Sequence, residues 1–133
     1  MILCYASDLL WSTRIRSTAE TLGIQVRPVR SVDMLAARLA DSPAPPIRAV
    51  VVDLDGEGPG LDLIRHLRRP DAAESERAIR IVAWAPHVEV EKLRAAKAAG
   101  ADAVMARGAF ARSLPRILRE LEDGAAVRDE MEE

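Results

Sequence analysis

Short apolar runs alternate with longer amphipathic segments along this sequence. In the longer segments apolar residues recur every three or four positions, which is the spacing of a helix with one buried face. The apolar runs have the length of buried strands. We expect strands at residues 2–6, 24–29, 49–53, 79–85 and 103–106. We expect helices at about 8–22, 31–39, 61–67, 88–99 and from about 113 onward.

Polar capping residues and glycines mark several of the predicted helix ends. Ser7 or Asp8 can cap the first helix and Ser31 the second, because a side-chain oxygen there accepts an otherwise unpaired backbone N–H. Gly23 and Gly100 are expected to end the first and fourth helices. These signals divide the chain into alternating strands and helices.

Other segments read as connections. Pro28 indicates an edge strand, and Pro115 is expected in the first turn of the last helix, where its missing N–H is harmless. We expect surface loops at 41–46, 56–60 and 69–76. Residues 1–123 should form one domain, followed by an acidic, frayed tail at 124–133.

The alternation of strands and helices predicts an α/β fold with a parallel sheet covered on both faces. Right-handed crossovers favour a doubly wound, three-layer sandwich with five strands in the order 2-1-3-4-5. In that order the first and third strands are neighbours where the order reverses. Asp53, at the end of the third strand, should therefore meet the turn formed by Ala6, Ser7 and Asp8.

Composition narrows the class of protein. The 133 residues are 49% hydrophobic and 30% charged with a net charge of −2, which fits a globular domain and gives no reason to expect nucleic acid as a partner. The single cysteine, Cys4, excludes a disulfide within the chain and is expected to be a small buried hydrophobe. With neither a signal peptide nor a membrane span in view, we expect a cytoplasmic protein.

Few residues point to a metal or phosphate site. The glycines of segment 56–60 are not followed by the Gly-Lys-Ser/Thr of a phosphate-binding loop. His66 and His87 have no Cys or His partner at ligand spacing, so no metal is expected. Asp53 is either a reactive carboxylate or one that accepts backbone N–H bonds or pairs with Arg107. Trp84 is expected in the core, and an exposed Trp11 would be a partner contact.

The chain resembles the receiver domain of response regulators, a CheY-like module with a flavodoxin-like fold, from residue 2 to about 121. The resemblance rests on Val51-Val52-Asp53-Leu54, on Ala98-Ala99-Gly100-Ala101-Asp102, and on the helix spacings between them. It implies a phospho-acceptor aspartate at Asp53. It also implies Mg²⁺ held by two acids after the first strand, a hydroxyl after the fourth strand and a lysine after the fifth.

The positions that correspond to that machinery are mostly altered. Ala6 and Ser7 stand where the two acids are expected, and Asp8 follows one place later. Ala85 stands at the hydroxyl position and Arg107 at the lysine position. We therefore interpret the chain as a degenerate pseudo-receiver.

The expected function is that of a stand-alone module of bacterial signal transduction that works by protein–protein contact without phosphorylation, and not as an enzyme. It needs no cofactor. The partner is a protein, or a second copy bound through the face formed by the fourth helix, fifth strand and last helix. One alternative is a phosphorylatable response regulator that uses Asp53, Asp8 and Asp55 with Mg²⁺. The other is a flavodoxin-like protein that binds a small ligand.

Overall fold

A parallel five-stranded sheet forms the centre of the molecule, in a computed structural model that describes residues 1–41 and 44–132. The strands lie in the order β2-β1-β3-β4-β5, as predicted. Their bounds are β1 Ile2–Tyr5, β2 Val26–Pro28, β3 Ala49–Asp53, β4 Arg80–Ala85 and β5 Ala103–Ala106. The register pairs Tyr5 of β1 with Val52 of β3, and Asp53 with Trp84 of β4. This register places the ends of β1, β3 and β4 at the same edge of the sheet.

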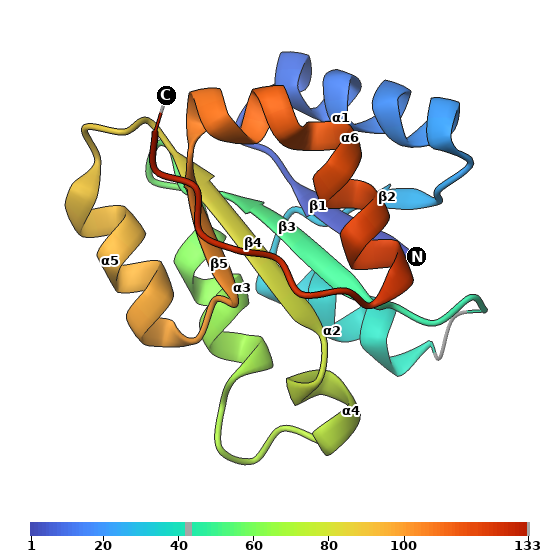
Figure 1. Cartoon of the computed structure of the whole chain (residues 1–133). Helices are drawn as coiled ribbons and strands as arrows, with labels where there is room; N and C mark the ends of the chain where they lie inside the picture. The colour runs from blue at the N-terminus through green and yellow to red at the C-terminus, as the bar shows by residue number, and fades with distance from the viewer. Residues whose placement is uncertain (42–43, 133) are drawn as a thin grey trace.

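Helices cover both faces of the sheet (Figure 1). Helices α1 and α6 pack on one face, and α2, α3 and α5 pack on the other. The helices are α1 Leu9–Leu22, α2 Val32–Ala40, α3 Gly60–Leu67, α4 Glu74–Arg77, α5 Val90–Ala99 and α6 Arg107–Asp123. The fold is the predicted doubly wound, three-layer α/β sandwich.

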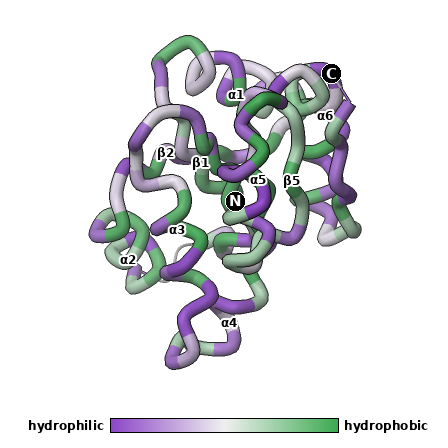
Figure 2. Tube along the Cα trace, turned by 90° about the vertical axis from the view of Figure 1, so that its left-hand side faces the viewer, coloured by the Kyte–Doolittle hydropathy of each residue, from purple (hydrophilic) through white to green (hydrophobic). Residues whose placement is uncertain are grey.

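The core consists of two apolar layers, one on each side of the sheet. All five residues of β3 are buried, because helices cover both of its faces. Hydrophobic residues lie along β1 and β5, inside an outer shell that is more hydrophilic (Figure 2). None of the helices in the described ranges 1–41 and 44–132 is long and apolar enough to cross a membrane.

The predicted caps are present. The Asp8 carboxylate accepts the backbone N–H of Trp11 at 2.8 Å, and Ser31 caps α2 in the same way. Gly23 and Gly100 end α1 and α5 with positive φ angles of 71° and 112°, a region that glycine enters without strain. Local sequence therefore determines these four helix ends.

The last helix begins earlier than predicted. It starts at Arg107, and Pro115 lies well inside it and not in its first turn. Proline has no N–H to donate to the carbonyl four residues earlier, which is that of Ala111. The guanidinium of Arg14 in α1 donates to the Ala111 oxygen at 3.4 Å. A contact between helices thus replaces part of the hydrogen bonding that Pro115 removes.

Two further segments differ from the predictions, and a third can be compared only in part. Residues 69–76 were expected to form only a loop, but they include the start of α4, a helix too short to leave a periodic pattern. Strand β2 covers only the middle of the predicted 24–29 strand. The predicted loop at 41–46 includes residues 42 and 43, which lie outside the described residues.

The end of the chain lies along the sheet, whereas the sequence predicts a frayed tail. After α6 the chain turns back and runs beside β5, where Met105 and Glu130 form a parallel bridge (Figure 1). The side chain of Val127 is buried in the same apolar layer as α1 and α6. We call residues 125–132 the tail segment. The last residue of the predicted tail, 133, lies outside the described residues.

Candidate functional site

Asp53 lies at the carboxyl end of β3 and is almost completely enclosed. It is 2% exposed, and within residues 1–41 and 44–132 it is the one buried side chain that is polar or charged. A carboxylate removed from water in this way is costly unless hydrogen bonds compensate it. The partners of its two oxygens therefore decide what it can do.

Both oxygens of the Asp53 carboxylate accept hydrogen bonds. Ser7 donates twice to Oδ2, through its backbone N–H at 2.9 Å and its hydroxyl at 2.5 Å. The backbone N–H of Asp55 donates to Oδ1 at 2.9 Å. Hydrogen bonds to a charged acceptor are the stronger kind. The carboxylate thus joins the β1–α1 turn to the β3–α3 loop, which confirms the predicted meeting of these segments.

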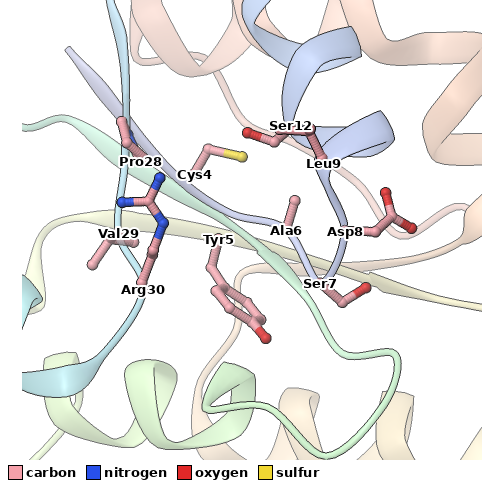
Figure 3. A pocket seen from close by; sticks show the side chains of 10 residues that line it. All are labelled: Cys4, Tyr5, Ala6, Ser7, Asp8, Leu9, Ser12, Pro28, Val29 and Arg30. Atoms are coloured by element: carbon pink, nitrogen blue, oxygen red, sulfur yellow. The ribbon is translucent and has the colours of Figure 1, made fainter.

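Asp8, the acid predicted to lie near Asp53, caps a helix instead. Asp8 is exposed and its carboxylate caps α1. In Figure 3 the Asp8 carboxylate and the Ser7 hydroxyl both point away from Arg30. Ala6 is half-buried against the core, and Ala85 is fully buried at the end of β4. Neither alanine side chain can donate or accept a hydrogen bond.

Arg107 pairs with Asp55 and not with Asp53, so the predicted Asp53–Arg107 pair is wrong. Its Nη1 lies 3.9 Å from Asp55 Oδ2, and the two side chains are 48% and 45% exposed. An exposed pair at this distance contributes little to stability. Asp55 also accepts the backbone N–H of Gly56 at 3.0 Å. In the described part of the chain no group of three or more His, Cys, Asp and Glu side chains is placed to hold a metal ion.

The β3–α3 loop is fixed by two contacts that the sequence did not indicate. Lys92 of α5 donates through Nζ to the carbonyl oxygen of Gly56 at 3.0 Å. Gly58 lies against the ring of Tyr5, and a Cβ atom there would be 1.9 Å from the Tyr5 hydroxyl oxygen. Burial, and secondarily the charge of Asp53, raise the pKa of Tyr5. No local motif marks either contact, because each depends on how separate elements pack.

A surface cavity of about 360 Å³ lies between the start of α1 and the end of β2 (Figure 3). Its wall includes the side chains of Cys4, Ser12 and Arg30. The Asp53 carboxylate does not line it. The cavity nevertheless adjoins the Asp53 site, because Ser7 lines the cavity and donates to the carboxylate.

Three of the few aromatic side chains form one cluster beneath the site. Trp84 stacks on Phe110 with ring centroids 4.1 Å apart and planes 3° apart. The ring of Trp11 lies 5.8 Å from each of them. Trp84 is fully buried, as predicted, while Trp11 is half-buried with Arg14 over its ring at 5.3 Å. The role of Trp11 as a partner contact stays a prediction.

The Cys4 thiol gives the fold a specific dependence on alkaline pH. Burial, with the nearby charge of Asp53, raises the pKa of Cys4 from 9.0 to about 12, and Arg16 opposes the shift. Between these values the unfolded chain loses the proton and the folded chain keeps it. The neutral thiol therefore stabilises the fold fully below about pH 9, and this contribution is lost as the pH rises toward 12.

We expect Cys4→Ala to lose less stability than the natural chain as the pH rises. The difference in slope should approach about 1.4 kcal/mol per pH unit. Urea unfolding at several values between about pH 8 and 11 measures it. The smaller alanine side chain lowers the free energy of unfolding by the same amount at every pH, so it does not change the slope. If the unfolding free energies of the two proteins changed in parallel with pH, the raised pKa of Cys4 would be contradicted.

Comparison with known proteins gives matches in structure only. No protein-family model matches the sequence, and no curated protein matches it. The receiver domain of NtrX from Brucella abortus superposes with a TM-score of 0.71 at 18% identity, over 94% of this chain and 100% of that chain. The signal receiver domain of a histidine kinase from Syntrophus aciditrophicus has a TM-score of 0.72 at 20% identity, over 92% and 89%.

A third match is the chemotaxis response regulator CheY4 of Vibrio cholerae. Its TM-score is 0.68 at 15% identity, over 90% of this chain and 96% of that chain. At these identities the likeness establishes the fold. The chain therefore has the CheY-like fold of response-regulator receiver domains.

Proposed function

We propose that this chain, which has the receiver fold, is a signalling module that binds other proteins without phosphorylation at Asp53. The state of the Asp53 carboxylate supports this most strongly. It is 2% exposed and accepts hydrogen bonds from Ser7 and Asp55. In this role Asp53 joins two loops and is not a nucleophile, and no metal or cofactor is needed.

The chemistry of phosphoryl transfer explains why this arrangement is unfavourable for an acceptor. A carboxylate oxygen must reach the phosphorus in line with the leaving group, and cations must offset the developing charge. The oxygens of Asp53 first have to leave the Ser7 and Asp55 donors. The charged neighbours that could help are engaged, since Asp8 caps α1 and Arg107 pairs with Asp55.

Exposed apolar side chains near the same edge of the sheet support a protein partner. Leu9 and Leu10, at the start of α1, are 78% and 79% exposed, and Val88, just before α5, is 73% exposed. Single exposed apolar residues are common, but these lie in the segments that follow the carboxyl ends of β1 and β4. Leu9 and Leu10 are neighbours, and exposed apolar neighbours of this kind are suited to contact with a protein partner.

Treatment with a small phosphodonor tests the proposal. We expect acetyl phosphate or a phosphoramidate with Mg²⁺ to leave the intact mass of the chain unchanged. A receiver domain with both metal-binding acids, treated in the same mixture, shows that the donor is active. An added mass of about 80 Da that Asp53→Asn abolishes would identify a phosphorylatable regulator and overturn the proposal.

A further inference from the structure

The tail segment runs beside β5 at the edge of the sheet and forms a single parallel bridge there, between Glu130 and Met105 (Figure 1). The backbone N–H of Glu130 donates to the oxygen of Val104 at 3.1 Å, and the N–H of Ala106 donates to the oxygen of Glu130 at 2.8 Å. These bonds satisfy groups that an edge strand otherwise exposes. The α5–β5–α6 face therefore accepts an extended peptide parallel to β5.

Acidic side chains of the tail segment contact basic side chains around this edge. Asp129 Oδ1 accepts from the backbone N–H of Val104 at 2.9 Å and from Lys97 Nζ of α5 at 3.1 Å. Glu130 pairs with Arg116 of α6 and accepts from the Ser113 hydroxyl at 3.1 Å. Both neighbouring helices thus contribute donors that an acidic peptide satisfies.

Further donors contact the backbone of the tail segment and carry no preference for its side chains. Arg112 Nη2 donates to the carbonyl oxygen of Glu132 at 2.8 Å. Arg80 donates to the carbonyl oxygen of Ala125 at 3.3 Å and to that of Gly124, the residue just before the tail segment, at 3.2 Å. A peptide from another chain offers the same carbonyl groups at these positions.

Little apolar area fixes the tail segment in place. Val127 is its buried apolar side chain, and Met131 is 43% exposed. The Lys97–Asp129 pair is about half exposed on both sides, and exposed pairs of this kind contribute little. The segment remains bound mainly because it is tethered, which gives it an effective concentration in the millimolar range.

We propose that the α5–β5–α6 face is a binding groove for an extended, acidic peptide of a partner protein, and that the tail segment occupies this groove as an intramolecular competitor. The inference rests on the proposed function and adds a second contact surface to the exposed apolar residues described there. Strand addition supplies affinity through the β5 backbone, and the basic side chains select for acidic residues. The partner gains access when it displaces the tail segment.

A full-length variant with a weakened tail tests this groove. The variant carries Asp129→Ala and Glu130→Ala, and the probe is a fluorescent peptide with the natural sequence of residues 124–132. Fluorescence anisotropy should show the peptide binding the variant at least about tenfold more tightly than the natural chain, because the tethered competitor is weaker. A peptide with Asn and Gln in place of the two acids should bind the variant more weakly than the natural peptide does. Asp123→Ala, which removes an exposed acid outside the tail segment, should behave as the natural chain.

Amide hydrogen exchange provides a second readout in the same proteins. The amides of Val104 and Ala106 should exchange faster in the double variant and become protected again when the peptide binds. Unchanged exchange in the variant would contradict a role for the acidic side chains. Equal peptide affinity for both proteins, or no binding to the variant, would overturn the proposal that this face is a peptide-binding groove. Phosphorylation of Asp53 would overturn the proposed function and leave these binding results unaffected.

Discussion

Replacement of Trp84 by alanine should lower the free energy of unfolding by about 3–5 kcal/mol, the largest effect we expect from a single substitution. The side chain is fully buried and stacks on Phe110 at 4.1 Å. Alanine leaves a cavity between β4, α1 and α6 that neighbouring side chains fill only in part. Because natural domains are stable by only about 5–15 kcal/mol, the variant should be close to unfolding at moderate temperature.

Trp84→Phe is the matched control. Phenylalanine preserves an aromatic stack on Phe110 and removes the indole N–H, which has no hydrogen-bond partner among the described residues. We expect a cost of about 1–2 kcal/mol, because less volume is lost and no hydrogen bond is broken. Urea unfolding followed by far-UV circular dichroism measures both variants. A cost below about 1 kcal/mol for Trp84→Ala would contradict the packing described for this cluster.

Removal of the Asp53 carboxylate should also be strongly destabilising. Asp53→Ala leaves the backbone N–H groups of Ser7 and Asp55 without their acceptor, and we expect a loss of about 3 kcal/mol. Asp53→Asn has the same size but one acceptor oxygen, so its loss should be smaller. Urea unfolding near neutral pH measures both.

The direction of this change separates a structural aspartate from a phospho-acceptor. An acceptor surrounded by other acids is repelled by them, so its replacement by a neutral residue relieves strain and is often stabilising. Here the nearest groups are hydrogen-bond donors. An Asp53→Ala variant as stable as the natural chain would therefore contradict the structural role.

The sheet and most helix ends could be predicted because they depend on local sequence. A short apolar run such as 49–53 is typical of a buried strand. Gly23 and Gly100 end their helices with a positive φ, which glycine adopts without strain. Pro115 was misleading for a related reason. Its usual place in the first turn of a helix is a local preference, whereas its actual place within α6 depends on Arg14 of another helix.

The detailed chemistry of the site could be predicted only in part. The strand order places Ser7 beside Asp53, but the sequence could not show that the serine donates twice to one oxygen. Arg107 was expected near the site and is there, yet its partner is Asp55, a choice that depends on where α6 begins. The acidic tail segment reads as solvated until Lys97 and Arg116 are brought beside it by the fold.

The coupling free energy between Ser7 and Asp53 tests the structural role of this carboxylate most directly. It is obtained from the unfolding free energies of the natural chain, Ser7→Ala, Asp53→Ala and the double variant. Because the Ser7 hydroxyl donates to a buried, charged oxygen at 2.5 Å, we predict a coupling of about 1.5–3 kcal/mol. A coupling within about 0.3 kcal/mol of zero would show that the two side chains act independently, and would contradict the structural role assigned to Asp53.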